Sequence, residues 1–367
     1  MKILFLITGL GLGGAEKQVC LLADKLIGNG HQVKILSLGA RKENKVLPDN
    51  PEVEVINIEM KKNIIGFFTG ITEIRKIISL FSPDIVHGHM FHANIMSRLA
   101  TIGKRRSIGV ISTAHSKNEG GDIRMLLYRL TDWLCDKCTN VSREALDALI
   151  NMRAFNKAKS ITVYNGIDVA RFSFDLAMRN QLRQQLCIKD DDILLLSVGR
   201  LTEAKDYPNL LNSLTLLPCH IKSVIIGDGH LRPKIEELVT ILNLKERVQL
   251  LGIKSNIAPY YSACDLFVLP SQWEGFGLVV AEAMACERLV VGTDSGGVRE
   301  VIGNDDFLVP ISNSEKLSQK ILEVSDKLVE DKVAIQKDNR EYILSNFSID
   351  MIVSKWTDIY SSIIESK

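Results

Sequence analysis

P-S-Q-W-E-G-F-G-L-V-V-A-E-A-M-A-C-E-R-L-V-V-G, residues 270–292, is the stretch around which the rest of the chain is organised. An apolar run before it predicts a buried strand, and residues 278–286 predict a helix. Gly275 and Gly277 lie between the two, so the segment predicts a strand-to-helix turn. Such a turn points the unpaired N–H groups of a helix start beyond the strand end, where the helix dipole also attracts an anion. We therefore expect a phosphate group to bind here.

Two carboxylates flank this predicted anion site: Glu274 just before the turn and Glu282 two turns into the helix. A ligand that was only a phosphate would not favour negative charge on both sides, so the ligand should also carry hydroxyl groups. A nucleotide-sugar meets both requirements, with ribose hydroxyls on one carboxylate and sugar hydroxyls on the other. The alternative for either carboxylate alone is structural, because acidic side chains near a helix start stabilise the helix dipole.

Length and composition indicate an ordinary globular protein of two domains. The chain has 367 residues, of which 46% are hydrophobic and 24% charged. Its seven cysteines are scattered and odd in number, which favours reduced thiols and a cytoplasmic location. The pair Cys135 and Cys138 leaves a redox or metal role as a minor alternative. No apolar run is long enough for a membrane span, and residues 2–8 are too short for a secretory signal.

The charge is unevenly distributed along the chain. Residues 1–168 carry 23 Lys and Arg against 16 Asp and Glu, whereas the remainder carries 22 against 28. A basic first half suits an anionic partner or the inner face of the cell membrane, and no aromatic-rich basic patch points to nucleic acid. Residues 60–68 place two lysines beside Ile and Phe, and with residues 104–106 they could form a membrane-facing patch. Alternatively, these apolar residues belong to the core.

Apolar runs alternate with amphipathic segments throughout the chain and predict an α/β protein with two Rossmann-like, doubly wound parallel sheets. The expected strands are residues 3–8, 32–38, 53–58, 84–87, 110–115 and 139–141, then 193–199, 221–227, 248–252, 265–270, 289–293 and 307–309. We expect domains at 1–168 and 169–347, with a helix at 348–367 that packs back and is long enough to brace both. Ligands of such sheets bind beyond the carboxyl ends of the strands.

A glycine-rich segment, G-L-G-L-G-G-A-E at residues 9–16, follows the first predicted strand. It matches the G-x-G-x-x-G pattern of dinucleotide-binding proteins, although no acidic residue follows the second strand to bind a ribose. Arg41 could instead suit a 2′-phosphate, which leaves an NADP-binding oxidoreductase as an alternative. Our preferred role is a loop that approaches the ligand, with Gly13 and Gly14 donating N–H groups to a pyrophosphate.

Histidines are concentrated in the first half. His87, His89 and His92 resemble metal ligands, but no cysteine or carboxylate completes a site, and we expect no metal. His115 ends a predicted strand and should project into the cleft, the alternative being a buried structural histidine. The run 190–192, three aspartates, precedes a strand and indicates a turn.

Two cations follow the first strand of the second half. Arg200 lies at the strand end and Lys205 five residues later, just before a helix. Fixed cations at this position can neutralise a diphosphate as it becomes a leaving group. A solvated surface position is the alternative for each of them alone, but the glycine-rich segment 227–229 and the Glu274 turn also follow strand ends.

Taken together, these motifs resemble the family 4 retaining glycosyltransferases of the GT-B fold, over nearly the whole chain. They are G-G-A-E at 13–16, Y-N-G-I-D at 164–168, G-R-x4-K at 199–205, G-D-G at 227–229 and E-x7-E at 274–282. The resemblance implies an N-terminal acceptor domain, a C-terminal donor domain, no cofactor and no metal. It implies that the sugar donor is a nucleoside diphosphate sugar, with UDP the commonest in the family.

The resemblance also implies residue roles. Arg200 and Lys205 would hold the diphosphate, Glu282 the ribose, and Glu274 with the backbone of Phe276 and Gly277 the transferred sugar, while His115 would reach that sugar from the opposite domain. The implied catalytic residues are Arg200, Lys205, Glu274 and His115. The implied donor-binding residues are Gly13, Gly14, Gly199, Gly229, Phe276, Gly277, Leu278 and Glu282, and Gly13 and Gly14 are also candidates for acceptor contact. Asn165 and Asp168 would lie near the acceptor or the cleft.

The expected reaction transfers a hexosyl or N-acetylhexosaminyl group to a saccharide acceptor, with retention of configuration. A polyprenyl-diphosphate-linked acceptor in surface polysaccharide synthesis, such as O-antigen or capsule, is what the resemblance and the basic first half favour. A nucleotide-sugar epimerase of the same fold is the alternative, and a non-catalytic sugar-nucleotide sensor a weaker one. The epimerase would give product from the donor alone.

Overall fold

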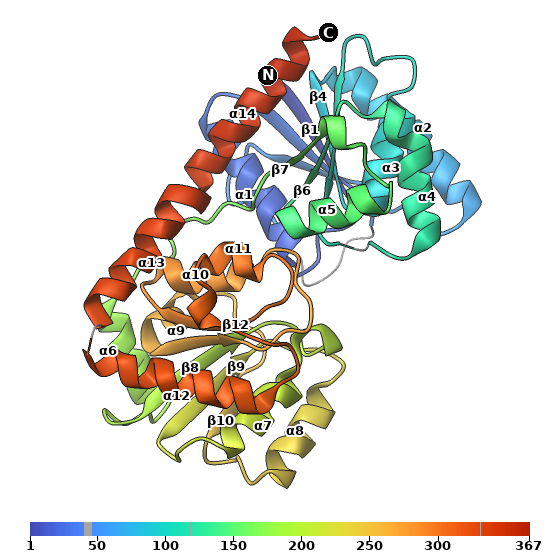
Figure 1. Cartoon of the computed structure of the whole chain (residues 1–367). Coiled ribbons are helices and arrows are strands. Elements are labelled where there is room, and N and C mark those ends of the chain that lie inside the picture. The colour runs from blue at the N-terminus through green and yellow to red at the C-terminus, as the bar shows by residue number, and fades with distance from the viewer. Residues whose placement is uncertain (40–45, 118, 331) are drawn as a thin grey trace. The chain divides into compact units, whose positions relative to one another are not determined.

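The chain divides into two compact units. The computed structural model describes residues 1–39, 46–117, 119–330 and 332–367 (Figure 1). Unit 1 comprises Met1–Gly166 with Ile349–Lys367, and unit 2 comprises Ile167–Ser348. Unit 1 thus ends two residues before the boundary expected after Asp168. Arg41 lies outside the described residues.

Unit 1 contains a seven-stranded parallel sheet in the order β3-β2-β1-β4-β5-β6-β7. Its strands are β1 (Lys2–Ile7), β2 (Gln32–Ser37), β3 (Glu54–Asn57), β4 (Ile85–His89), β5 (Gly109–Ala114), β6 (Lys137–Asn140) and β7 (Ser160–Thr162). The sequence pattern predicted six of these and missed β7, because three residues with two hydroxyl side chains give no apolar run. β7 pairs with β6 at the edge of the sheet.

Helices cover both faces of this sheet, because side chains alternate along each strand and both sets are apolar. Along β1, Ile3, Phe5 and Ile7 belong to a core shared with α1 and α14, while Leu4 and Leu6 pack with α2 and α3. The helices of unit 1 are α1 (Gly14–Gly28), α2 (Ile64–Phe81), α3 (Phe91–Ala100), α4 (Asp122–Thr131), α5 (Arg143–Asn151) and α14 (Ile349–Glu365). Figure 1 shows α1 and α14 on one side of the strands and α2, α3 and α4 on the other.

Unit 2 contains a six-stranded parallel sheet in the order β10-β9-β8-β11-β12-β13. Its strands are β8 (Ile193–Val198), β9 (Ile221–Ile226), β10 (Val248–Leu250), β11 (Leu266–Leu269), β12 (Leu289–Thr293) and β13 (Leu308–Val309). Its helices are α6 (Leu176–Gln185), α7 (Tyr207–Thr215), α8 (Arg232–Ile241), α9 (Ala258–Ala263), α10 (Leu278–Ala285), α11 (Val298–Ile302), α12 (Ser314–Glu330) and α13 (Lys332–Phe347). The two doubly wound sheets agree with the predicted fold class.

The last helix completes the core of unit 1. In α14, Trp356 and Tyr360 are buried and stack with ring centroids 5.6 Å apart. The Tyr360 hydroxyl lies 2.8 Å from Nδ1 of His87, whose Nε2 lies 2.7 Å from the Thr113 hydroxyl. Burial holds the pKa of His87 well below its ordinary value, so the ring is neutral and both of its nitrogens have partners. His87 is therefore a structural histidine that joins β4 and β5 to α14.

No helix in the described part of the chain has the length and hydrophobicity that a bilayer crossing requires.

The position of Trp356 predicts a large effect of truncation on stability. Trp356→Ala should lower the free energy of unfolding by about 3–5 kcal/mol, because it leaves a cavity in the unit 1 core. Ser354→Ala, at an exposed position of the same helix, should change it by less than about 0.5 kcal/mol. Urea denaturation followed by circular dichroism measures both changes. Equal effects of the two substitutions would show that α14 does not contribute to the stability of the unit 1 core.

Candidate active site

The predicted site residues of unit 2 gather at the carboxyl edge of its sheet. β11 pairs with β8 on one side and with β12 on the other, so the loops that follow these strands are neighbours. The loop after β11 is tied to the loop after β8, because the Gln272 N–H donates to the Ala204 carbonyl over 2.9 Å. The Gln272 side chain also donates to Asp206 over 3.2 Å. Topology therefore brings together segments that lie about seventy residues apart in sequence.

Glycines allow the backbones of these loops to touch. Gly227, after β9, has φ +142°, and a Cβ atom there would overlap the carbonyl oxygen of Gly199. Gly296, after β12, has φ +61°, and a Cβ atom there would overlap the carbonyl oxygen of Glu274. Any other residue would push the loops apart. A Cβ atom at Gly229 would likewise overlap the carbonyl oxygen of Leu201, whose N–H donates to the Asp228 carbonyl over 3.0 Å.

Lys205 and Glu274 form an ion pair at this edge. The Lys205 Nζ contacts Glu274 Oε1, which also accepts a hydrogen bond from the Ser271 hydroxyl over 2.8 Å. The side chains are only 18% and 13% exposed, so each retains little contact with water. Lys205 ends a single 3-10 turn, Glu203–Lys205, before α7. A partly buried ammonium beside a carboxylate can bind a ligand that presents both an anion and a hydroxyl group.

The helix start predicted from the sequence lies next to this pair. α10 begins at Leu278, and Gly277 precedes it as the N-cap with φ +92°. The Phe276 side chain is buried, with its ring 5.4 Å from that of Phe347, so only its backbone is suited to ligand contact. The α10 dipole favours an anion at this end of the helix. The turn therefore has the anion-attracting geometry that the sequence predicted.

Glu282, in the second turn of α10, is 5% exposed. The Tyr261 hydroxyl of α9 donates to its Oε2 over 2.7 Å. Burial raises the pKa of Tyr261 well above its ordinary value, so the phenol keeps its proton and remains a donor. Tyr261 thus fixes the orientation of the carboxylate. Arg200, by contrast, is exposed and follows the close-packed Gly199 directly.

Comparisons with known proteins assign both units to one group of enzymes. Residues 12–171 match the profile of the family described as "Glycosyltransferase Family 4", and residues 178–341 match that described as "Glycosyl transferases group 1". The chain belongs to glycosyltransferase family 4. This membership confirms the predicted enzyme class, a glycosyltransferase of the hexosyltransferase class that takes its sugar from a nucleotide-sugar with retention of configuration.

Full-length relatives and a solved structure agree with this assignment. An N-acetylgalactosaminyltransferase of Campylobacter jejuni acting on N-acetylgalactosamine-N,N'-diacetylbacillosaminyl-diphospho-undecaprenol is 28% identical, over 94% of this chain and 99% of its own. An Escherichia coli UDP-Gal:α-D-GlcNAc-diphosphoundecaprenol α-1,3-galactosyltransferase is 26% identical, over 81% of each chain. The crystal structure of Anabaena HepE in complex with UDP superposes with a TM-score of 0.86 at 19% identity and covers 99% of this chain and 100% of that one. These matches confirm the GT-B fold.

In unit 1 of this glycosyltransferase, His115 follows β5 directly. Its Nε2 lies 3.2 Å from Nδ1 of His89, and its backbone N–H donates to Glu119 over 3.0 Å. Burial lowers the pKa of His115 to about 4, so the imidazole is neutral near pH 7. A neutral ring can donate or accept a hydrogen bond but cannot supply a positive charge.

The two glycines of the N-terminal loop lie at the start of α1. Gly13 is the N-cap and Gly14 the first helical residue. The Glu16 carboxylate lies against the position that a Cβ atom of Gly13 would occupy. Because Glu16 places negative charge at this helix start, the pyrophosphate contact predicted for Gly13 and Gly14 requires Glu16 to move. That contact stays a prediction.

The two residues predicted near the cleft fall on either side of the unit boundary. Asn165 is buried in unit 1, and Asp168 belongs to unit 2. Asp168 accepts hydrogen bonds from the N–H groups of Ala170 and Arg171, over 3.2 and 3.1 Å, and so stabilises its own turn. This contact gives Asp168 a structural role that the Y-N-G-I-D motif did not indicate.

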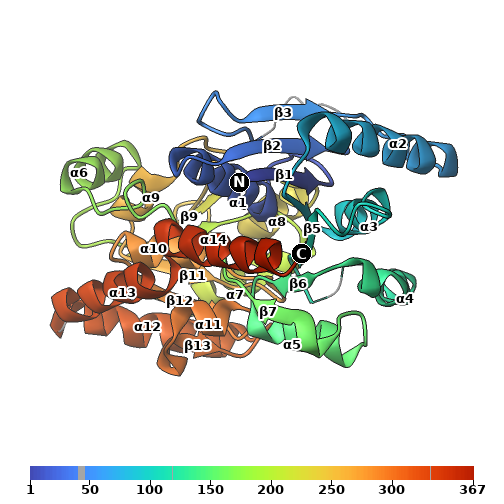
Figure 2. The same ribbon diagram turned by 90° about the horizontal axis from the view of Figure 1, so that it is seen from above.

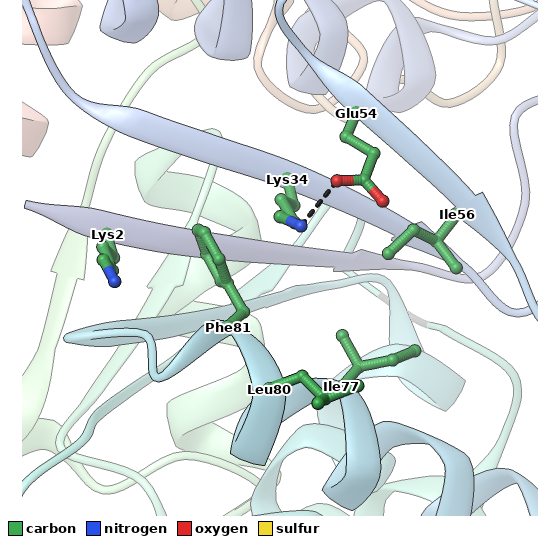
Figure 3. Close-up of a pocket in the computed structure, with 7 residues that line it drawn as sticks. All are labelled: Lys2, Lys34, Glu54, Ile56, Ile77, Leu80 and Phe81. Atoms are coloured by element: carbon green, nitrogen blue, oxygen red, sulfur yellow. Dashed lines mark ion pairs between the residues drawn. The ribbon is translucent and has the colours of Figure 1, made fainter.

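Two other features of the described residues bear on where a ligand could bind. No three His, Cys, Asp or Glu side chains of these residues gather as a metal-binding group. A hollow of about 240 Å³ lies in unit 1, where Lys34 of β2 pairs with Glu54 of β3 over 2.5 Å and Phe81 closes one side (Figure 3). Lys2, at the start of β1, also lines this hollow. The hollow is therefore at the amino edge of the sheet, opposite the edge where Rossmann-like folds bind ligands.

Sequence reasoning missed three residues that orient the predicted ones. Tyr261 donates a hydrogen bond to Glu282, and Ser271 donates one to Glu274. Glu119 accepts a hydrogen bond from the backbone N–H of His115. Neither Tyr261 nor Glu119 belongs to a motif. The Tyr261 contact joins two different helices, α9 and α10, and the Glu119 contact lies in the loop between β5 and α4. Ser271 lies inside the decisive stretch, three residues before Glu274, and that spacing was the available signal.

Glu119 predicts a pH dependence of stability. Burial raises its pKa from 4.5 to about 7, although its carboxylate accepts hydrogen bonds from the Tyr128 hydroxyl and the His115 N–H. The folded protein then holds this proton more tightly than the unfolded chain does. The stabilisation is complete below pH 4.5 and is lost as the pH rises to about 7, a change of about 3 kcal/mol.

Glu119→Gln should remove this component. Urea denaturation from pH 4.5 to 8 measures the unfolding free energy of both proteins. As the pH rises, the wild type should lose stability relative to the variant. The comparison is needed because burial also lowers the pKa of His87, His89 and His115, whose effect on stability has the opposite sign. Parallel curves for the two proteins would contradict the assignment.

Proposed function

We propose that this glycosyltransferase moves a hexosyl or N-acetylhexosaminyl group from a UDP-sugar to a hydroxyl of a saccharide acceptor carried on a polyprenyl diphosphate. The observation that carries the proposal is the partly buried pair of Lys205 and Glu274 beside the start of α10. This edge offers positive charge for a diphosphate and a carboxylate for sugar hydroxyls within one hydrogen-bonded cluster. Unit 2 would bind the donor and unit 1 the acceptor.

The choice of donor and acceptor is supported by proteins that this chain resembles. HepE is described in complex with UDP and with UDP-glucose, and the E. coli relative is named for UDP-Gal. Both named relatives act on acceptors linked to diphosphoundecaprenol. A surface polysaccharide, such as an O-antigen or a capsule, is the kind of product that such acceptors serve.

The diphosphate leaving group is where the site can lower the barrier. Negative charge grows on the departing phosphate as the bond from the sugar C1 to the phosphate oxygen breaks. Lys205, Arg200 and the α10 start would stabilise that charge more in the transition state than in the ground state. Before the donor binds, Glu274 shares the Lys205 ammonium, and the phosphate would take part of that contact over.

The carboxylates then position the hydroxyl groups of the donor. Glu282, held by Tyr261, would accept from the ribose hydroxyls, and Glu274 from the transferred sugar. Backbone groups of Gly199, Gly229, Gly277 and Leu278 would complete the donor site, and the neutral His115 would serve as a hydrogen-bonding partner of the sugar.

We further propose front-face attack. The acceptor oxygen bonds to C1 on the face that the phosphate leaves, and the acceptor proton passes to an oxygen of the departing UDP. This path retains the configuration and requires no enzyme nucleophile. Domain closure would limit donor hydrolysis by excluding water.

A panel of nucleotide-sugars tests the donor assignment. UDP-sugars should raise the thermal midpoint of the protein, and mass spectrometry should then detect one added hexose or N-acetylhexosamine on a polyprenyl-diphosphate saccharide. Conversion of the donor with no acceptor present would instead identify an epimerase. Stabilisation by NADPH alone would contradict the proposal.

The charge argument predicts the effect of removing Lys205. Lys205→Ala should lower kcat by about 10²-fold or more, as loss of a preorganised charge does. Lys245→Ala, which removes an exposed lysine of the same unit, should leave kcat unchanged. Initial rates at saturating donor measure both, and thermal unfolding checks that the variants are folded. Full activity in a folded Lys205→Ala protein would refute the role.

A further inference from the structure

Asp206, directly after Lys205, has a backbone conformation that few side chains tolerate. Its φ of +42° and ψ of +48° are left-handed, a region that is unfavourable for most L-residues and that Asp and Asn enter more readily. Asp206 ends the 3-10 turn that contains Lys205, and α7 starts at the next residue. The residue before a helix usually has extended backbone. Here the left-handed residue lets the turn and the helix follow each other without a linker.

Glycine would suit this backbone better, so the Asp206 side chain should have a role of its own. That side chain makes no capping hydrogen bond to α7. Its Oδ2 instead accepts from the Gln272 amide over 3.2 Å and from the Ser312 hydroxyl over 2.9 Å. Gln272 follows β11 and Ser312 follows β13. One carboxylate oxygen therefore ties the loop after β8 to the loops after two other strands.

Ser312 is left-handed as well, with φ +51°. Most non-glycine residues with positive φ in the described chain follow the end of an α-helix, where this conformation is common. Ser312 instead lies in the loop between β13 and α12. Two strained residues that hydrogen-bond to each other, Asp206 and Ser312, persist only where the surrounding structure fixes them, and such strain is concentrated at functional sites.

The elements behind the two loops support this contact. The helices that follow the loops, α7 and α12, pack against each other (Figures 1 and 2). At the start of α12, the Ser314 hydroxyl donates to Asn209 of α7 over 3.0 Å. Asp206 and Ser312 are therefore held together by their helices as well as by their own hydrogen bond.

The contacts of Asp206 bear directly on Lys205. The Lys205 Nζ contacts Glu274, and its stem lies over Gly199, where a Cβ atom would come within 2.8 Å of Lys205 Cε. The next residue, Asp206, holds Gln272, which lies two positions before Glu274. The Asp206 carboxylate thus joins the turn that carries the ammonium to the loop that carries its partner carboxylate.

We propose that Asp206 is a positioning residue for the transfer reaction and holds the Lys205 ammonium in place through its hydrogen bonds to Gln272 and Ser312. When a diphosphate takes over part of the Lys205 contact, the tie to Glu274 weakens, and the tie through Asp206 remains. The inference deepens the proposed function and rests on it, since it gives Lys205 the task of stabilising the leaving group. The competing explanation is a crosslink that serves stability alone.

Asp206→Gly tests the role of the carboxylate, because it keeps the left-handed backbone and removes both hydrogen bonds. kcat should fall by about tenfold or more, as misplacement of a reacting group does. KM for the donor should change by less than about threefold, because the ammonium acts mainly in the transition state. Initial rates measure both, with whichever of UDP-glucose, UDP-galactose and UDP-N-acetylgalactosamine the wild type turns over. The thermal midpoint should move by no more than about 3 °C, since glycine relieves the strained backbone.

Asp206→Asn separates hydrogen bonding from charge. Both donors contact the same oxygen, and an amide oxygen has two lone pairs, so Asn can accept both bonds and also tolerates the backbone. kcat of this variant should stay within about threefold of the wild type. Gln272→Leu combined with Ser312→Ala removes the donors instead of the acceptor and should reproduce the loss of kcat in Asp206→Gly.

A matched control makes the same kind of substitution away from the site. Asn243 is exposed, has φ +56°, and lies between α8 and β10, at the amino edge of the unit 2 sheet. Asn243→Gly should leave kcat unchanged.

Fluorescence gives a second readout that needs no substrate. Trp273 lies next to Gln272 and is 50% exposed. Trp356 is buried, so in a Trp133→Phe background acrylamide quenching reports chiefly on Trp273. The quenching constant should rise in Asp206→Gly, because the loop after β11 loses a tie, and it should keep the wild-type value in Asp206→Asn.

Four outcomes would overturn the positioning role. They are wild-type kcat in a folded Asp206→Gly protein, Asp206→Asn as slow as Asp206→Gly, an equal loss of kcat in Asn243→Gly, and unchanged quenching of Trp273. Failure of the proposed function looks different, because Lys205→Ala would then retain full activity. An impaired Lys205→Ala protein beside a fully active Asp206→Gly protein would contradict the positioning role alone.

Discussion

Close contact between loop backbones is the constraint on which the predicted donor site depends. At the carboxyl edge of the unit 2 sheet, Gly227 lies against the Gly199 carbonyl and Gly296 against the Glu274 carbonyl. With side chains at these two glycines the loops would separate, and Lys205 could not reach Glu274. The glycines therefore act through the position they give to charged residues elsewhere, not through contact with a ligand of their own.

The same edge illustrates how a partly buried ion pair can be useful without being a large source of stability. Two charges with little exposure lose hydration, and their mutual attraction only partly compensates for that loss. In the proposed function, a diphosphate that took over part of the Lys205 contact would find an ammonium group already dehydrated and oriented. Ser271 and Tyr261 extend this orientation to the two carboxylates. The predicted site would thus be oriented before a ligand binds, which is the condition for electrostatic catalysis.

In unit 1 the buried groups at the sheet edge are histidines and not an ion pair. His87, His89 and His115 lie at the ends of β4 and β5, and burial lowers their pKa values, so this edge of the sheet has polar groups but no histidine charge near pH 7. Exposed lysines and arginines lie elsewhere in the unit, among them Lys61, Lys62 and Arg106. This edge of the unit 1 sheet therefore lacks histidine charge, whereas the corresponding edge of unit 2 holds the ion pair of Lys205 and Glu274.

The sequence by itself determined the fold class and twelve of the thirteen strands that the described residues form, and it singled out Lys205, Glu274 and Glu282, because apolar periodicity and glycine-flanked strand ends are local patterns. It could not determine which side chains meet, since the ion pair joins residues 69 positions apart and the Tyr360 contact with His87 spans 273. Nor could it separate a core apolar residue from an exposed one: Met125 and Leu126 are apolar neighbours, and only the cluster that Met125 forms with residues of α3 and α5 places one of them inside. Hydrophobicity is a property of each residue, whereas burial and pairing are properties of the assembled tertiary structure.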